Sequence, residues 1–200
     1  MSESIKVMAL KVNWEIMEEI IDFYETNQLY FNNYNTISDI DSIINLIHFK
    51  QRYIEALESK KRYSKALPIL TEVDILLQKI KKEEIYKKVY ERYMFLSGLI
   101  YGRLNRNHES FEYFIELRTI DPENDLYKNW YVSLKSNIWY NQFRILSYIG
   151  MGLIFLDIIL GLFFDSGLNK FIVLIALIVM VAGIVFPYIT KYIIKNKLNG

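Results

Sequence analysis

Two long runs of apolar residues near the C-terminus constrain the fold of this chain more than any other feature. Between residues 145 and 164 the only strongly polar side chain is Asp157, and residues 171–190 carry no charge. A helix of about 20 residues rises roughly 30 Å, which matches the hydrocarbon layer of a bilayer. The sequence therefore predicts a transmembrane region, residues 144–200, that follows a soluble region, residues 1–143.

The short link between the two apolar runs predicts that they form an antiparallel hairpin. Residues 165–169 contain the turn formers Ser, Gly and Asn. Lys135 and Arg144 precede the first run and three lysines follow the second, whereas the link side has only Lys170. Because basic residues favour the cytoplasmic side, we expect an integral membrane protein with both termini in the cytoplasm. Two buried core helices of a soluble protein are the alternative, which the small size of the soluble region disfavours.

Asp157 is the most distinctive residue of the apolar runs. It lies about 10 Å inside the link-side end of its helix, where an ionised acid costs a few kcal/mol. Its level on the second helix, near Ile178, offers no polar partner. Two interpretations stay open: a neutral acid tolerated in hairpin packing, or a functional acid in an oligomer or channel. The small residues Gly150, Gly161 and Gly183 predict close contact between helices.

The first 143 residues predict an all-helical domain. Apolar residues recur there at three- and four-residue spacings, and the only glycines are Gly98 and Gly102. The predicted helices span residues 13–28, 38–59, 63–80, 83–104, 108–120 and 122 onward. The Asn-rich segment 30–36 is predicted to be a loop.

Cap signals predict where two of these helices begin. Ser38 is a predicted N-cap, with Asp41 in the capping-box position. Asp121 precedes Pro122, a residue favoured in the first helical turn, and is predicted to cap the sixth helix. No Gly or Pro follows before the membrane, so this helix is expected to continue into the first apolar run.

One part of the helical region resembles a tetratricopeptide repeat. The resemblance lies in residues 91–122: Gly98 and Tyr101 in the first helix, Asn105-Arg106-Asn107 at the turn, Ser110 and Phe114 in the second helix, and Pro122 after Asp121. Residues 46–80 are similar to a second copy, with residues 61–67 at its turn. Matching Ala66 to Ser110 gives a spacing of 44 residues, whereas the family repeats at about 34.

The resemblance implies an all-α stack of about six antiparallel helices that binds a protein or peptide on its concave face. In this family the first helix of each pair lines that face. The corresponding residues here are His48, Gln51, Glu55, Arg92, Phe95, Leu99 and Arg103. Gly98, Tyr101, Ser110 and Phe114 would pack the helices against one another. A helical bundle without repeats is the alternative.

Several classes of function are disfavoured by composition. Residues 1–143 carry 19 basic and 21 acidic side chains, so a nucleic-acid partner is not expected. The chain has no Cys and two histidines, His48 and His108, neither in a metal-binding pattern. No glycine-rich phosphate loop is present. We therefore expect no catalytic activity, no cofactor and no metal.

These patterns together favour a membrane-anchored adaptor that binds a cytoplasmic protein and holds it at a membrane. One alternative is an oligomeric membrane effector or pore that uses Asp157, formed as a homo-oligomer through the hairpin. Another is an accessory subunit of a larger membrane complex. The sequence does not identify the partner.

Overall fold

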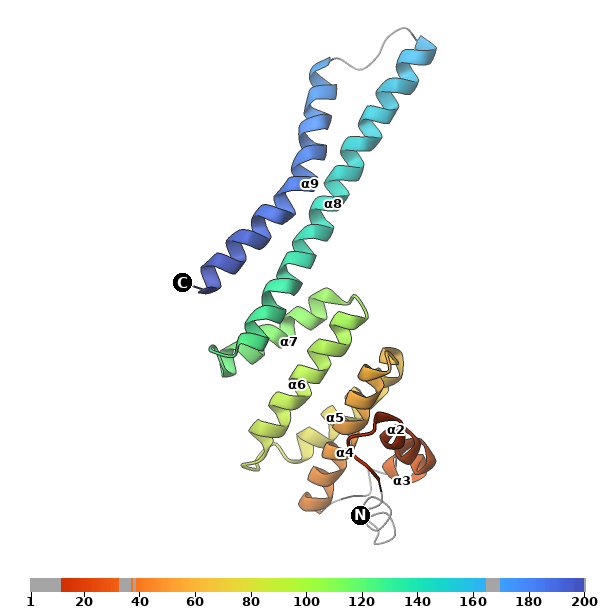
Figure 1. Cartoon of the computed structure of the whole chain (residues 1–200), viewed down its shortest axis with the longest axis vertical. Coiled ribbons are helices and arrows are strands. Elements are labelled where there is room, and N and C mark those ends of the chain that lie inside the picture. The colour runs from red at the N-terminus through yellow and green to blue at the C-terminus, as the bar shows by residue number, and fades with distance from the viewer. Residues whose placement is uncertain (1–11, 33–36, 38, 165–169, 200) are drawn as a thin grey trace. The chain divides into compact units, whose positions relative to one another are not determined.

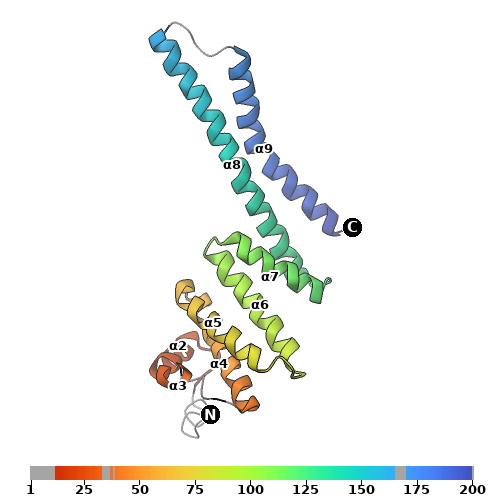
Figure 2. The ribbon, with the colours of Figure 1, turned by 180° about the vertical axis from the view of Figure 1, so that it is seen from behind.

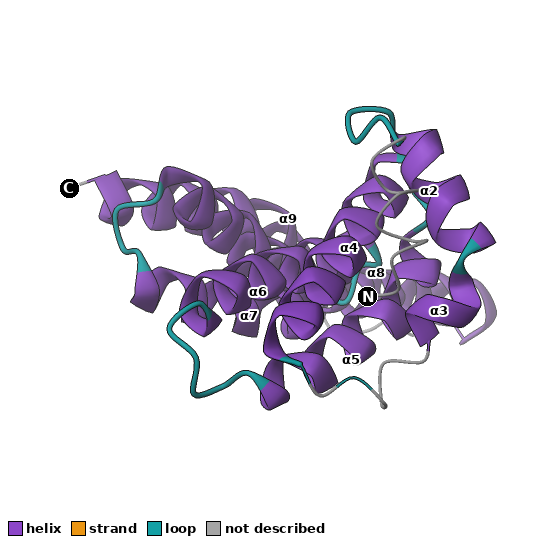
Figure 3. Cartoon of the chain, turned by 90° about the horizontal axis from the view of Figure 1, so that it is seen from below, coloured by secondary structure: helices purple, strands orange, loops and turns teal. Residues whose placement is uncertain are grey.

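A computed structural model of the chain describes residues 12–32, 37, 39–164 and 170–199. In these residues α-helix is the only regular secondary structure (Figure 3), which confirms the predicted all-α class. The helices are α2 (Met17–Thr26), α3 (Gln28–Asn32), α4 (Ile40–Ser59), α5 (Tyr63–Lys79), α6 (Tyr86–Arg103), α7 (Asn107–Ile120), α8 (Asp125–Phe164) and α9 (Lys170–Asn199).

The chain divides into two compact units, residues 1–120 and 121–200. Helix α8 is unbroken from Asp125 to Phe164 (Figure 1), so it runs across residue 143, where the soluble region is expected to end. The predicted continuation of the sixth helix into the first apolar run is therefore present in the structure.

The N-cap of α8 differs from the prediction. The side-chain oxygen of Asn124 accepts hydrogen bonds from the N–H groups of Leu126 (3.1 Å) and Tyr127 (3.4 Å). Asp121 does not cap this helix, since the Asn124 N–H closes a turn on the Asp121 carbonyl and delays the first helical residue. Asn caps helices as well as Asp does, so local sequence preference alone does not separate the two sites.

The start of α4 and the predicted loop at residues 30–36 also differ. Asp39 caps α4 by accepting a hydrogen bond from the Ser42 N–H (2.9 Å), while the predicted cap Ser38 lies outside the described residues. Residues 30–32 belong to helix α3 and are not a loop; residues 33–36 lie outside the described residues. Phe31 explains the helix, because its fully buried ring stacks on Tyr24 at 4.4 Å.

Helices α4 to α7 form two successive antiparallel hairpins, α4–α5 and α6–α7 (Figures 1 and 2). The turns that close them have matching hydrogen bonds. The Arg62 N–H donates to the Leu57 carbonyl (2.8 Å), and the Arg106 N–H donates to the Tyr101 carbonyl (2.9 Å). This bond, from the second residue past the C-cap to a carbonyl five residues earlier, defines a Schellman turn.

The α6–α7 hairpin packs closely through small residues. The Ser110 hydroxyl donates to the Gly98 carbonyl (2.6 Å), and both residues are buried. A Cβ atom added at Gly98 would lie 2.7 Å from the Phe114 ring, which is fully buried against it. Tyr101 stacks on Tyr113 with ring centroids 5.8 Å apart. The close helix approach thus depends on the missing side chain of Gly98.

A charged residue lies in the core of the first unit. Lys50 on α4 is fully buried, donates to the Tyr24 hydroxyl (2.8 Å) and forms an ion pair with Glu72 on α5. Tyr24 stacks between Phe31 and Tyr53, so the ammonium group lies against an aromatic cluster. Burial lowers the pKa of Lys50, and the Glu72 carboxylate opposes that shift.

The second unit consists of α8 and α9, which lie side by side. A Cβ atom at Gly150 would lie 2.8 Å from the Ala176 carbonyl, and one at Gly183 would overlap the Ser147 hydroxyl. Both helices are long and apolar enough to cross a membrane. In the most apolar 18-residue window of each helix, few residues are buried: 11% of the window in α8 and 12% of the window in α9.

Candidate functional site

The charged residues predicted to line a partner-binding groove form ion pairs between α4 and α6. Arg92 donates to Glu55 Oε1 from Nε (3.0 Å) and Nη2 (2.5 Å). Arg103 Nε lies 3.0 Å from Glu58 Oε1. Each arginine therefore already has a carboxylate on the facing helix. A partner that used these groups would have to break pairs that join the two helices.

The uncharged groove residues differ in their exposure. Gln51 is fully buried, and its Nε2 donates to the Val89 carbonyl (3.0 Å), so its side chain lies in the interior and not in a groove. Phe95 and Leu99 are half-buried, and the Phe95 ring meets Phe114 edge-on at 6.1 Å. His48 stays exposed. Its pKa is lowered by partial burial of the ring and then by nearby positive charge.

A continuous line of aromatic rings, which we call the tyrosine row, runs over α6 and α7. In spatial order its members are Tyr86, Tyr90, Tyr93, Tyr113 and Tyr101. Successive ring centroids are 5.1, 6.0, 6.4 and 5.8 Å apart. The first three recur at four- and three-residue spacing on α6, which places them on one helix face. All but Tyr93 remain partly exposed, so the row forms part of the surface of α6 and α7.

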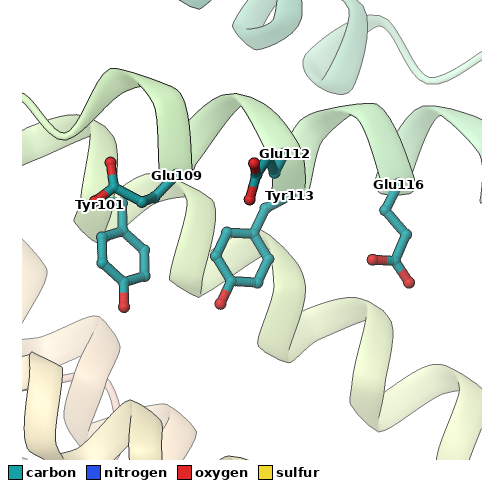
Figure 4. Close-up of a pocket in the computed structure, with 5 residues that line it drawn as sticks. All are labelled: Tyr101, Glu109, Glu112, Tyr113 and Glu116. Carbon is teal, nitrogen blue, oxygen red and sulfur yellow. The ribbon is translucent and has the colours of Figure 1, made fainter.

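One end of the tyrosine row opens into an acidic cavity of about 300 Å³ (Figure 4). The lining residues are Tyr101, Glu109, Glu112, Tyr113 and Glu116. In Figure 4 the rings of Tyr101 and Tyr113 point the same way, and the three glutamates lie along α7 beside them. The glutamates recur at three- and four-residue spacing, so one face of α7 presents all three carboxylates.

Arg106 shows how a cation can bind at this cavity. Its guanidinium carbon lies 4.5 Å from the centroid of the Tyr101 ring, and its Nε donates to Glu109 Oε1 at 2.8 Å. A tyrosine face and a carboxylate thus hold the guanidinium together, and both contacts favour a positive charge. Glu112 forms no ion pair within the described part of the chain.

The hydroxyls of Tyr90 and Tyr113, near the cavity, stay neutral at physiological pH. Burial, followed by the Glu116 carboxylate, raises the pKa of Tyr90 to about 12, and the Tyr90 hydroxyl donates to Glu116 (3.3 Å). Burial also raises the pKa of Tyr113. The negative charge of the surface therefore resides on its carboxylates, beside uncharged aromatic rings. Such a surface can bind lysine or arginine side chains.

The sequence predicts only Tyr101 of this set, and only as a packing residue. A signal for the others exists in the spacing of Tyr86, Tyr90 and Tyr93 and in the similar spacing of the α7 glutamates. Neither pattern indicates that the two helices meet with these faces on the same side. That juxtaposition comes from the α6–α7 hairpin.

The intramembrane candidates lie on α8 and α9. Gly150 and Gly183 occupy close contacts between the two helices, whereas a Cβ atom at Gly161 would meet nothing within 4 Å among the described residues. Among the described residues, Gly161 thus makes no contact like those of Gly150 and Gly183. Asp157 is half-buried, and its Oδ1 is shielded from solvent with no hydrogen-bond partner in the described part of the chain.

Within the described ranges no group of three or more His, Asp or Glu side chains is placed to hold a metal ion. Comparison of the chain with family models, curated proteins and solved structures finds no match. The residues and their geometry are therefore the basis for assigning a function.

Proposed function

We propose that this protein is a membrane-anchored helical adaptor: α8 and α9 span a bilayer, and α4 to α7 bind a cytoplasmic protein. One observation carries the proposal. The apolar windows of α8 and α9 are only about one-tenth buried, whereas the first unit has its own closed core, in which Ile47, Val73 and Ile100 are fully buried. Core helices of a soluble protein would be covered by protein, and lipid is the natural cover for helices that are not.

The arrangement of α4 to α7 supports a stack of the tetratricopeptide type. Helix α4 contacts both its own partner α5 and the next first helix α6, and α5 contacts α6. This is the neighbour pattern of successive helix pairs in a repeat protein. Two further features support the stack. The turn after α4 matches the turn after α6, 44 positions later, and the buried small residue Ala66 matches Ser110 at the same spacing.

The partner-binding surface in this proposal is the tyrosine row with its acidic cavity, where Glu112 forms no ion pair within the described part of the chain, whereas Glu55 and Glu58 on the α4–α6 face are paired with Arg92 and Arg103. The partner is a protein segment that carries arginine or lysine. Arg106, held by Tyr101 and Glu109, is the intramolecular example of the contact.

Cysteine labelling tests the anchor, because the native chain contains no Cys. Single substitutions Ser2→Cys, Asn199→Cys and Ser166→Cys would be labelled in intact membrane vesicles by an impermeant maleimide. We expect Ser2→Cys and Asn199→Cys to react from the cytoplasmic side and Ser166→Cys to react from the opposite side. Reaction of all three from one side would contradict a spanning hairpin.

Peptide binding tests the adaptor surface with the full chain in lipid nanodiscs. Fluorescence anisotropy would compare a labelled Arg-Gly-Ser repeat peptide with a Glu-Gly-Ser peptide of the same length. We expect binding of the basic peptide alone, weakened roughly fivefold by Glu112→Gln through loss of a charge-assisted contact. Glu84→Gln removes the same charge from an exposed turn outside the cavity and serves as the matched control. Equal effects of the two variants would contradict the site.

Asp157 favours a second candidate, an oligomeric membrane effector. A buried carboxylate oxygen without a partner is costly, and a second copy of the hairpin can supply the missing donor. Ion flux through liposomes would be compared for the native chain and Asp157→Asn. A flux that the substitution changes severalfold supports the effector, and negligible flux from both proteins contradicts it.

A further inference from the structure

A second cavity, of about 230 Å³, lies between α8 and α9. The contact of Ser147 with Gly183 sets the register of the two antiparallel helices. Tyr188 on α9 is therefore level with Tyr140 and Arg144 on α8, and Met180 is level with Met151. The cavity thus has a polar end with a guanidinium and tyrosine hydroxyls, and an apolar end with thioether side chains. About 10 Å of helix separate Arg144 from Met151.

Arg144 is the cation at the polar end of the cavity. Its side chain is exposed, and its guanidinium carbon lies 5.9 Å from the centroid of the Tyr140 ring. No carboxylate of the described residues forms an ion pair with it. A guanidinium offers five N–H donors in a fork that matches a phosphate group. At one end of a cavity whose other end is apolar, these donors favour an anionic ligand.

We propose that this cavity binds an anionic phospholipid, with the phosphate on Arg144 and an acyl chain along Met151 and Met180. The proposal rests on the membrane-spanning role of α8 and α9. Tyr140 and Tyr188 line the same end and add hydroxyl groups to it. A phospholipid has its charged group at one end and its acyl chain at the other. It therefore matches a cavity that is polar at the Arg144 end and apolar at the Met151 end. Basic pockets between cytoplasmic helix ends are known to suit anionic headgroups.

The charge of the cavity selects among lipids. No Asp or Glu is among the described residues that line it, so the ammonium group of a zwitterionic choline lipid would meet Arg144 without a balancing negative charge. Phosphatidylglycerol keeps the phosphate and adds no cation. The cavity is therefore expected to prefer phosphatidylglycerol to phosphatidylcholine.

Native mass spectrometry of the full chain in detergent tests this site directly. Lipid adducts would be counted while phosphatidylglycerol, phosphatidylcholine or glycerol phosphate is titrated. We expect half-occupancy by phosphatidylglycerol at about a tenfold lower concentration than by phosphatidylcholine, because both lipids offer a phosphate to Arg144 but the choline cation of phosphatidylcholine opposes the guanidinium. Arg144→Gln should bring the two lipids to within about twofold, and Arg144→Lys should restore part of the preference because the charge returns without the fork.

Lys135→Gln is the matched control, because it removes one positive charge from the same helix outside the cavity. It should leave the lipid preference unchanged. No preference in the native chain, or an equal loss in Lys135→Gln and Arg144→Gln, would overturn the proposal. Displacement of the lipid by an equal concentration of glycerol phosphate would also overturn it, since the site would then recognise free phosphate. The mass spectrometry is done in detergent and does not need a bilayer. Cysteine labelling tests the membrane-spanning hairpin separately, so the two proposals can fail independently.

Discussion

Lys61 and Asn105 occupy the same place in two successive helical hairpins. Each follows the C-cap of the first helix of its pair, and each has a positive backbone φ, 58° at Lys61 and 60° at Asn105. The two positions are 44 residues apart, as are the buried residues Ala66 and Ser110. Positive φ at this position is the left-handed residue of a Schellman turn.

The first prediction concerns the cost of the left-handed conformation. Lys61→Gly is expected to raise the free energy of unfolding by about 1 kcal/mol, because Gly has no Cβ to oppose positive φ. Asn105→Gly should raise the free energy of unfolding by less, since Asn tolerates the left-handed conformation better than Lys does. Ser64→Gly, in the right-handed first turn of α5, should instead destabilise by roughly 0.5–1 kcal/mol. Urea unfolding of each variant measures these changes, and destabilisation by Lys61→Gly would contradict the turn assignment.

The second prediction concerns the buried Lys50–Glu72 pair. Glu72→Gln should lower the free energy of unfolding by about 3 kcal/mol, because it leaves the fully buried ammonium group without its carboxylate. The double variant Lys50→Met with Glu72→Gln should be less destabilised than Glu72→Gln alone, since no charge is then buried. Glu18→Gln breaks the exposed pair with Lys60 and should change stability little. Similar urea midpoints for Glu72→Gln and Glu18→Gln would contradict the prediction, because the loss of stability on breaking an ion pair would then not depend on its burial.

The third prediction concerns the contact between α8 and α9. Gly183→Ala places a methyl group on the Ser147 hydroxyl and 2.7 Å from the Phe143 carbonyl. We expect it to destabilise the helix pair by roughly 1–3 kcal/mol, seen as a lower Tm in detergent. Gly152→Ala adds the same group where nothing lies within 4 Å and should leave the Tm unchanged. The contact would be in doubt if both substitutions lowered the Tm equally.

The fourth prediction concerns pH. Partial burial, then Arg92 and Lys88, lower the pKa of His48 from its usual 6.5. Well above pH 6.5, His48 is neutral in both the folded and the unfolded chain and does not make the free energy of unfolding depend on pH. As pH falls below 6.5, the unfolded chain binds the proton more readily than the folded chain, so the free energy of unfolding decreases. His48→Gln should flatten this decrease between pH 7 and pH 5, and Lys88→Gln should reduce it partly. Unfolding curves across that range with identical slopes for all three proteins would refute the assignment.

Helix positions were largely predictable because local periodicity and turn residues determine them. The helix at Tyr63, for example, begins at the predicted residue, and α8 continues through both polar and apolar sequence as expected. The misplacements have tertiary or competing local causes. Phe31 is helical because its ring is buried against Tyr24. Asn124 caps α8 in place of Asp121 because the turn that the Asn124 N–H closes on the Asp121 carbonyl delays the first helical residue.

The candidate site was less predictable. The residues expected in a groove lie on the expected helices, but Gln51 is buried and Arg92 is paired with Glu55. Whether a charged side chain meets solvent or a facing carboxylate depends on how two helices pack, and the period of one helix carries no information about the other. The tyrosine row is distributed over α6 and α7 for the same reason.

By itself the sequence determined the helical class, most helix bounds and the two apolar helices, because hydrophobic periodicity and run length act along the chain. Only the tertiary structure decided that Arg106 lies on Tyr101 beside the α7 carboxylates and that Gly183 meets Ser147. The physical reason is that contacts between helices depend on their relative rotation and register, which short-range sequence preferences do not specify.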